Sequence, residues 1–265
     1  MTAHKQLFEK KSNKIAVITG ASRTQGIGAA ICRALAKDGV DIFFTYWSKY
    51  DQSMPWGIDL DEPRLLQEEL RHRGVRCECL EVDLSAPDAY LTVLDEVKMK
   101  LGDPSILVNN ACFSTNDGYS VLDSTSLDNH YAINVRATTM LSVEFARRFS
   151  KGSGGRIINL TSGQAKGPMP GEIAYAATKG AVEALTLTLS AEVAPIGITV
   201  NAVNPGPTDT GWMSEETKQY LLTKSPFGRI GLPEDAARLV AFLASEEAAW
   251  ITGQVIHSEG GFMRK

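Results

Sequence analysis

The sequence lacks the features that would place the protein in a membrane, outside the cell or on nucleic acid. Its 265 residues contain no apolar run near the roughly 20 residues that a membrane-spanning helix needs. Residues 1–14 are polar and have no apolar core of a secretory signal, so we expect a cytoplasmic protein with no membrane partner. Acidic residues outnumber basic ones by 31 to 27, which leaves no basic surface for nucleic acid.

Cysteine and histidine are scarce, with four of each, and neither set has the spacing of a metal site. No C-x-x-C pair occurs, and Cys77 and Cys79 are two residues apart on a predicted strand, where both would face the same side. We therefore expect reduced thiols that fill small spaces in the core, and no bound metal.

Short runs of Val, Ile, Leu and Phe alternate with longer amphipathic segments. Strands are predicted at 15–19, 41–46, 75–82, 106–109, 157–160, 198–203 and 255–257, and helices at 28–37, 63–73, 87–101, 127–149 and 175–193. Strands that are apolar throughout are typical of a parallel sheet covered on both faces. The sequence thus predicts an α/β fold, a single doubly wound Rossmann-type domain over residues 14–265 after an extension at 1–13. Its sheet would be seven-stranded and mainly parallel, with helices on both faces.

A glycine-rich turn joins the first predicted strand to the first predicted helix. Gly20, Gly26 and Gly28 lie within it. The free N–H groups and positive dipole end of a helix N-terminus suit a pyrophosphate, and glycine allows the backbone to approach it. The same pattern also fits a tight turn that only packs a helix closely on a strand. Because of its place in the fold, we interpret it as a dinucleotide-binding turn.

The second predicted strand ends without an acidic residue. A chain that binds NAD usually has Asp or Glu there to hold the ribose 2′-hydroxyl, whereas this one has Tyr46, Trp47 and Ser48. No carboxylate would repel a 2′-phosphate, and Arg23 in the glycine turn and Lys49 could attract one. We therefore expect NADPH to be preferred over NADH.

A serine, a tyrosine and a lysine form the second informative pattern. Tyr175 and Lys179 are four residues apart near the start of a predicted helix, so they share one face. A nearby ammonium would favour the phenolate and lower the pKa of Tyr175 toward neutral pH. Ser162 follows the fifth predicted strand and could hold a substrate oxygen beside the phenol. The Tyr-Lys spacing alone also fits an ordinary exposed helical pair.

These patterns occur together with others in the order and spacing of one enzyme family. The full set is the glycine turn, Asn109-Asn110-Ala111, Asn134, Ser162, Tyr175, Lys179 and Asn204-Pro205-Gly206. Over residues 14–262 the sequence therefore resembles the short-chain dehydrogenase/reductase family. Within the family it is similar to bacterial 3-oxoacyl-[acyl-carrier-protein] reductases, mainly through residues 197–201 and 251–254.

The resemblance implies the residues of an active site. Tyr175 would be the general acid, Lys179 would lower its pKa and bind the nicotinamide ribose, and Ser162 would orient the carbonyl. Asn134 would hold a water that links Lys179 to solvent. The implied cofactor-binding residues are Gly20, Ser22, Arg23, Gly26, Ile27, Tyr46, Trp47, Asp83, Leu84, Asn110, Ala111, Tyr175, Lys179, Pro205, Gly206 and Thr208. The residues expected around the substrate are Gln164, Met169, Glu172, Trp212 and Met213.

The resemblance also implies an activity and its alternatives. We expect NADPH-dependent reduction of a 3-oxoacyl thioester, with acyl carrier protein as the partner that such a substrate suggests, by a homotetramer. One rival activity is NAD(P)-dependent oxidation of a sugar or another small secondary alcohol. Another is dinucleotide sensing without turnover, against which the intact Ser162, Tyr175 and Lys179 argue. Enoyl reduction is the least favoured.

Three features depart from the family pattern. The glycine turn is two residues longer than usual, as in the enoyl reductases, but those enzymes have Lys seven positions after the tyrosine, where this chain has Val182. Cys112 replaces the usual Gly and could be an oxidisable thiol. Residues 47–61 form a longer, aromatic segment that would cover the adenine end of the cofactor, contact a neighbouring subunit or pack locally. Residues 207–232 have few periodic apolar positions and would form a mobile lid.

Overall fold

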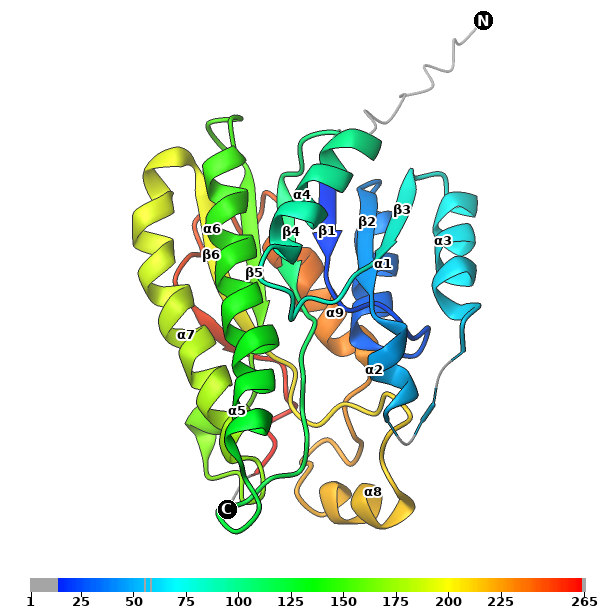
Figure 1. The fold of residues 1–265 in the computed structure, drawn as a ribbon, viewed down its shortest axis with the longest axis vertical. Coiled ribbons are helices and arrows are strands. Elements are labelled where there is room, and N and C mark those ends of the chain that lie inside the picture. Colours follow the sequence, from blue (N-terminus) through cyan, green and yellow to red (C-terminus); the bar gives the residue numbers. More distant parts are fainter. Residues whose placement is uncertain (1–13, 55, 58, 264–265) are drawn as a thin grey trace, which may run out of the picture.

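The fold is a parallel sheet between two layers of helices (Figure 1). The computed structural model describes residues 14–54, 56–57 and 59–263, so the extension predicted at 1–13 lies outside the described residues. Within that part of the chain, seven strands pair in the order β3-β2-β1-β4-β5-β6-β7, and every pairing is parallel. They are β1 (Ile15–Ile18), β2 (Asp41–Tyr46), β3 (Cys77–Glu81), β4 (Ile106–Asn109), β5 (Gly155–Leu160), β6 (Ile198–Asn204) and β7 (Val255–His257).

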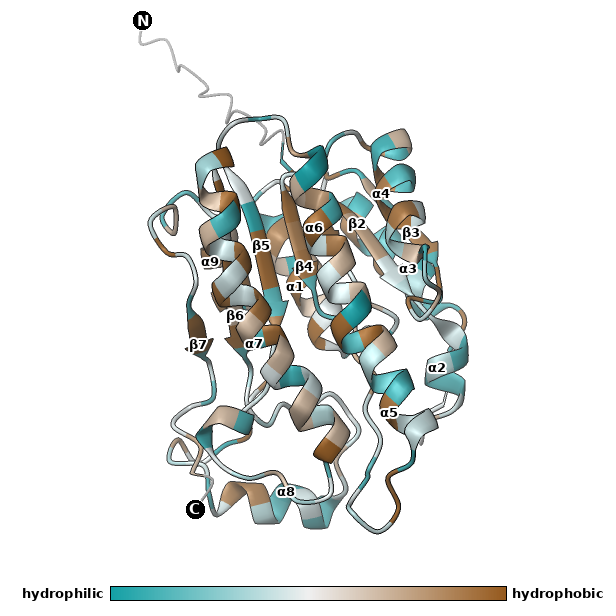
Figure 2. Ribbon diagram, turned by 60° about the vertical axis from the view of Figure 1, so that its left-hand side comes forward, coloured by the Kyte–Doolittle hydropathy of each residue, from teal (hydrophilic) through white to brown (hydrophobic). Residues whose placement is uncertain are grey.

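The helices cover both faces of the sheet. They are α1 (Ile27–Lys37), α2 (Ser48–Gln52), α3 (Glu62–His72), α4 (Ala89–Lys100), α5 (Ser124–His130), α6 (Thr138–Arg148), α7 (Ile173–Val193), α8 (Glu215–Leu222) and α9 (Pro233–Ala244). The core has two parts because the central strands carry apolar side chains on both faces of the sheet, and Figure 2 shows these strands as largely hydrophobic. Ile18 of β1 packs with α1, α3 and α9, whereas the neighbouring Val17 packs with α4, α6 and α7. The predicted doubly wound Rossmann-type architecture is confirmed.

Two regions depart from the helices predicted from the sequence. The helix predicted at 127–149 begins at Ser124 and is interrupted by a π-helical stretch, η1 (Tyr131–Ala137), between α5 and α6. Helices α2 and α8 were not predicted. Helix α8 lies within the expected lid, where the side chain of Ser214 caps it by accepting a hydrogen bond from the N–H of Thr217. It buries no residue, so it has no apolar periodicity that the sequence could reveal.

The strand order places the candidate site. From β1 the chain builds outward to β2 and β3, then crosses back to β4 on the other side of β1. At such a reversal the loops that follow the two neighbouring strands diverge and leave a crevice at the carboxyl ends. Helices α2, α5 and α8 lie at one end of the molecule (Figure 1). Among the described residues, none of the helices combines the length and apolar character needed to span a bilayer.

Candidate active site

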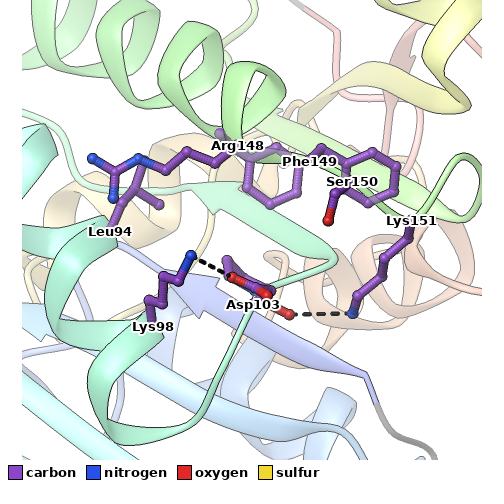
Figure 3. A pocket seen from close by; sticks show the side chains of 9 residues that line it. Leu94, Lys98, Asp103, Arg148, Phe149, Ser150 and Lys151 are labelled. Carbon is purple, nitrogen blue, oxygen red and sulfur yellow. Dashed lines mark hydrogen bonds and ion pairs between the residues drawn. The ribbon is translucent and has the colours of Figure 1, made fainter.

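A cavity of about 240 Å³ lies at the carboxyl ends of β1 to β4. Its lining includes every residue predicted for cofactor binding in the loops after those strands: Gly20, Ser22, Arg23, Gly26, Ile27, Tyr46, Trp47, Asp83, Leu84, Asn110 and Ala111. A second hollow between α4 and the end of α6, lined by Leu94 and Arg148 among others, has about 20 Å³ (Figure 3). That is room for little more than one water. The first cavity is the candidate site because the predicted cofactor-binding residues line it.

Two glycines of the turn are required by the packing of the protein itself. Gly20 has φ +73°, and a Cβ there would lie 2.6 Å from Cα of Ala111. A Cβ on Gly28 would lie 2.5 Å from the carbonyl oxygen of Gly20. The side chain of Asn110 donates hydrogen bonds of 2.9 and 2.8 Å to the carbonyls of Thr19 and Gly20. The alternative interpretation, a tight turn that packs a helix closely on a strand, is therefore correct in part. These two glycines do not by themselves indicate a bound ligand, and the evidence for one comes from other features of the turn.

The N-terminus of α1 supplies such a feature. Its N-cap residue is Gly26, which has no side chain to cap the helix, and the first turn contains no acidic residue. Gly26, Ile27 and Gly28 all line the cavity. The first N–H groups of the helix and its positive dipole end thus lie at the cavity wall, where they fit the pyrophosphate of a dinucleotide.

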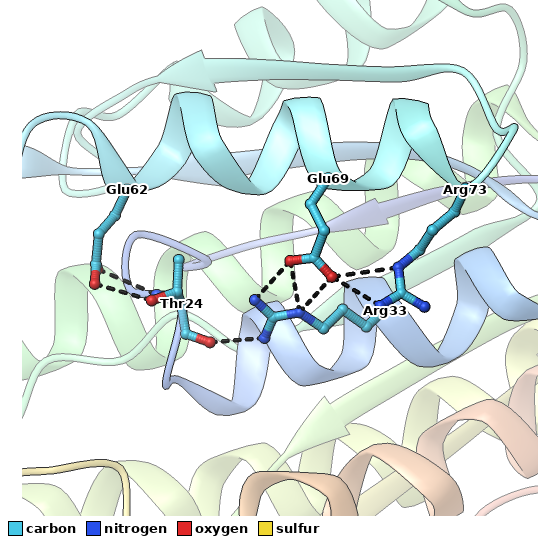
Figure 4. A network of polar contacts seen from close by, with 5 residues as sticks. All are labelled: Thr24, Arg33, Glu62, Glu69 and Arg73. Atoms are coloured by element: carbon cyan, nitrogen blue, oxygen red, sulfur yellow. Dashed lines mark hydrogen bonds and ion pairs between the residues drawn. The ribbon is translucent and has the colours of Figure 1, made fainter.

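The lengthened glycine turn is held at Thr24 by side chains of α3 and α1 (Figure 4). The carboxylate of Glu62 accepts hydrogen bonds from the backbone N–H and the hydroxyl of Thr24, at 3.1 and 3.0 Å. Arg33 donates to the carbonyl of Thr24 at 2.7 Å and forms an ion pair with Glu69, to which Arg73 also donates. The longer turn is therefore a built part of the fold.

Arg23 joins the turn to two distant segments. Its guanidinium donates a hydrogen bond to the carbonyl of Thr210 and lies 4.5 Å from the ring centroid of Trp56. The indole N–H of Trp56 in turn donates to Asp51 at 2.9 Å. Arg23 thus links the aromatic segment after β2 with the segment predicted as a lid, which sequence analysis did not anticipate.

Part of the aromatic segment forms a wall of the cavity. Tyr50, Asp51 and Trp56 line it. The ring of Tyr50 lies 5.8 Å from that of Phe113 and 6.5 Å from that of Trp56, and its hydroxyl is hydrogen bonded to the backbone of Ser114. Sequence analysis noted the aromatic residues of segment 47–61 but did not assign Tyr50, Asp51 or Trp56 to the site.

The serine, tyrosine and lysine of the second pattern come together at the start of α7. Ser162 follows β5, and its hydroxyl is hydrogen bonded to Tyr175 and lies 3.9 Å from the sulfur of Met169. Tyr175 is in the first turn of α7. Lys179, one turn later and buried, donates to the carbonyl of Leu160 at 2.7 Å, with its nitrogen 5.5 Å from the ring centroid of Tyr175.

The protonation of Tyr175 differs from the sequence-based expectation. Burial raises its pKa, electrostatic interactions with Cys112 and Glu172 raise it further, and the hydrogen bond with Ser162 opposes them. Burial lowers the pKa of Lys179. The expectation that Lys179 lowers the pKa of Tyr175 is therefore wrong for the protein alone, because desolvation of the phenol prevails. The phenol is held in its protonated form, which is the form that can donate a proton.

Asn134 connects the loop after β4 to α7. It lies in the π-helical stretch, where its amide oxygen accepts from the N–H of Phe113 at 2.7 Å. Its NH₂ group donates to the carbonyl of Phe113 at 2.9 Å and to the hydroxyl of Thr178 at 3.0 Å. The side chain is thus engaged with the protein, and its predicted water-holding role stays a prediction.

The remaining predicted cofactor-binding residues lie in the loop after β6. Pro205, Gly206 and Thr208 follow β6, and the hydroxyl of Thr208 donates to the carbonyls of Pro205 and Gly206. These three, like Tyr175 and Lys179, are outside the lining of the cavity itself.

The predicted substrate residues come from the segments before and after α7 in the sequence. Gln164, Met169 and Glu172 precede α7. Met213 is buried and Trp212 is 51% exposed. Among the described residues, no His, Cys, Asp or Glu side chains are grouped to hold a metal ion.

Comparisons with known proteins agree with this geometry. A family model described as enoyl-(acyl carrier protein) reductase matches residues 20–263. The uncharacterized oxidoreductase YjdA of Bacillus subtilis is 57% identical over 95% of this chain and 97% of its own length. An NADPH-dependent aldehyde reductase-like chloroplastic protein of Arabidopsis thaliana is 33% identical, and the match covers 95% of each chain. The 3-oxoacyl-[acyl-carrier-protein] reductase FabG of Staphylococcus epidermidis is also 33% identical, and the match covers 94% of this chain and 98% of FabG. The crystal structure of a metagenomic blue fluorescent protein in complex with NADPH superposes with a TM-score of 0.85 at 33% identity, covering 94% of this chain and 97% of that one.

Proposed function

This chain belongs to the short-chain dehydrogenase/reductase family of oxidoreductases, and from that premise we propose that it reduces a carbonyl group to a secondary alcohol with NADPH. The observation that carries the proposal is the contact of Tyr175 with Ser162, close to Cys112 in the wall of the dinucleotide cavity. A protonated phenol, a hydroxyl and a buried ammonium are there held together by the fold, before any ligand is present.

Each residue has a distinct part in this proposal. Tyr175 donates its proton to the carbonyl oxygen, because its phenol is protonated at neutral pH. Ser162 orients the same oxygen and stabilises the charge that develops on it. Lys179 compensates the phenolate that forms, and Asn134 holds the loop after β4 against α7. Bound NADPH would supply the hydride, and the cavity and the N-terminus of α1 would hold the cofactor in place.

The structure around Arg23 supports NADPH as the cofactor. Asp41, the acidic residue of β2, is at the far end of that strand and is paired with Arg76. Asp51 and Glu62 lie near Arg23 and accept hydrogen bonds from Trp56 and Thr24, and neither forms an ion pair with Arg23. The positive charge of Arg23 at the cavity wall therefore favours a 2′-phosphate. NADPH in the superposed fluorescent protein agrees with this preference.

A 3-oxoacyl thioester is the substrate we propose, with acyl carrier protein as its carrier and a cytoplasmic homotetramer as the working form. The similarity to FabG supports this choice. The matched family model is described by enoyl reduction, but in this chain the position seven residues after Tyr175 is Val182, which is buried in the core, and the lysine is Lys179. Carbonyl reduction therefore fits these residues better.

The test is to follow the nicotinamide absorbance of NADPH and NADH with β-ketoacyl thioesters, diketones, ketones and aldehydes. We expect NADPH oxidation with at least one carbonyl, and a loss of about 10²- to 10⁴-fold in Tyr175→Phe with unchanged NADPH affinity. Tyr119→Phe, on a fully exposed tyrosine, is the matched control. No oxidation of NADPH with any carbonyl would overturn the proposal in favour of dinucleotide sensing, and equal rates with NADH would overturn the cofactor preference.

A further inference from the structure

Helix α7, which carries Tyr175 and Lys179, is not capped by its own N-terminal residue. Glu172 occupies the N-cap position and its side chain makes no capping hydrogen bond. The acceptor comes instead from Asp117, 56 residues away in the sequence. One carboxylate oxygen of Asp117 accepts from the N–H of Ile173 at 2.5 Å, and the other accepts from the N–H of Ala174 at 3.2 Å. These are the two residues that immediately precede Tyr175.

Asp117 is well placed for strong hydrogen bonds. It is 4% exposed, and its own N–H donates to the carbonyl of Gly171 at 2.6 Å, so both its backbone and its side chain bind the segment that begins α7. Hydrogen bonds from N–H groups to an ionised carboxylate are about twice as strong as neutral ones. A negative charge at a helix N-terminus also interacts favourably with the helix dipole.

The loop that carries Asp117 is itself fixed to the cavity. Between β4 and Asp117, Cys112 lines the cavity and Phe113 is bound through both its N–H and its carbonyl by Asn134. The N–H of Thr115 donates to the buried His130 at 3.4 Å. A short, anchored length of chain thus connects the cavity wall to the first turn of α7.

We propose that Asp117 is a positioning residue that sets the place of the Tyr175 phenol relative to the dinucleotide cavity. Without its carboxylate, the first N–H groups of α7 lose their acceptors, and the first turn must shift or fray to find water. Tyr175 lies in that turn, and a displacement of about 1 Å at a reacting group costs on the order of 100-fold in rate. The inference rests on the proposed function, in which Tyr175 is the proton donor.

The experiment compares Asp117→Ala with Asp117→Asn and with a matched control. The control is Asp123→Ala, which removes the cap of α5 in the same loop, where Asp123 accepts from the N–H of Ser126 at 2.7 Å. For each variant one measures the melting temperature, the NADPH dissociation constant, kcat and KM well below melting, and amide hydrogen exchange at residues 173–176.

For Asp117→Ala we expect kcat to fall about 10- to 100-fold with the NADPH affinity within about twofold of wild type, and exchange at 173–176 to accelerate. Asp117→Asn should be intermediate, because its oxygen can still accept from Ile173 while its NH₂ group faces the N–H of Ala174. Asp123→Ala should leave kcat and this exchange unchanged. If Asp117→Ala does not fold, Asp117→Asn carries the same comparison.

The result that overturns the inference is a variant at position 117 with a lower melting temperature but wild-type kcat, or with unchanged exchange at 173–176. Such a protein would show that Asp117 serves only stability. Failure of the proposed function has a different signature, since the wild type would then turn over no carbonyl, or Tyr175→Phe would keep its rate. The exchange measurement tests the cap in either case.

Discussion

The anchor of the glycine turn on α3 makes a quantitative prediction. Glu62 holds Thr24 by two hydrogen bonds of 3.1 and 3.0 Å (Figure 4). The substitution Glu62→Ala removes both bonds and leaves the N–H of Thr24 without this acceptor. Arg33 of α1 still holds the carbonyl of Thr24 at 2.7 Å, so the turn loses its hydrogen bonds to α3 and keeps this one.

The magnitude follows from the charge and burial of the bonds. Hydrogen bonds to a charged group contribute about 1.5–3 kcal/mol each when buried. Glu62 and Thr24 are only half-buried, so solvent screening reduces the pair to a total of about 1–2 kcal/mol. If cofactor binding must restore the order of the turn, this free energy is lost from binding, which corresponds to about 5- to 30-fold weaker NADPH binding.

The assay is a fluorescence or calorimetric titration of NADPH, with thermal melting in parallel. Glu62→Gln keeps one acceptor oxygen and should bind NADPH with intermediate affinity. Glu68→Ala is the matched control, because Glu68 is on the same helix and forms an exposed ion pair with Arg64. Wild-type affinity in Glu62→Ala would refute the reasoning, since the turn would then keep its binding geometry without α3.

Two further predictions concern the aromatic wall and Tyr175. In Trp56→Ala, Arg23 loses the ring whose centroid lies 4.5 Å from its guanidinium. We therefore expect NADPH to dissociate about 3- to 10-fold faster in stopped-flow fluorescence. An unchanged dissociation rate would show that the aromatic wall does not retain the cofactor. Because burial raises the pKa of Tyr175, its proton-donating form persists into the alkaline range, and kcat/KM for reduction should be level from about pH 6 to 8 and fall only above that. A fall near neutral pH would show that this pKa is lowered in the working complex.

The parts of the fold that the sequence predicted are those determined by local composition. Strands such as 106–109 and 157–160 are apolar on both faces, and only a sheet buried on both sides suits them. The glycine turn and the Ser-Tyr-Lys pattern were found because each lies directly after a strand or at a helix start. Helix α8 could not be predicted because it buries no residue and therefore leaves no apolar period.

Other features depend on contacts between distant segments. The cap of α7 by Asp117 spans 56 residues, and no pattern in either segment indicates the other. The π-helical stretch that contains Asn134 adds no change in hydrophobic pattern that would distinguish it from an α-helix. The raised pKa of Tyr175 also depends on burial, which the spacing of Tyr175 and Lys179 does not reveal. The spacing of Tyr175 and Lys179 thus predicted that the two side chains lie close together, but not that the phenol is shielded from water.

The two unusual insertions of the chain are parts of one structure. The longer glycine turn supplies Arg23, and the longer segment after β2 supplies the Trp56 ring on which its guanidinium lies. The same guanidinium donates to Thr210, in the segment before α8. A group at the cofactor cavity is therefore bound directly to the segment that borders the predicted substrate residues Trp212 and Met213. We therefore expect a shift of Arg23 toward a bound 2′-phosphate to alter its hydrogen bond to Thr210 and, through it, the conformation of this segment.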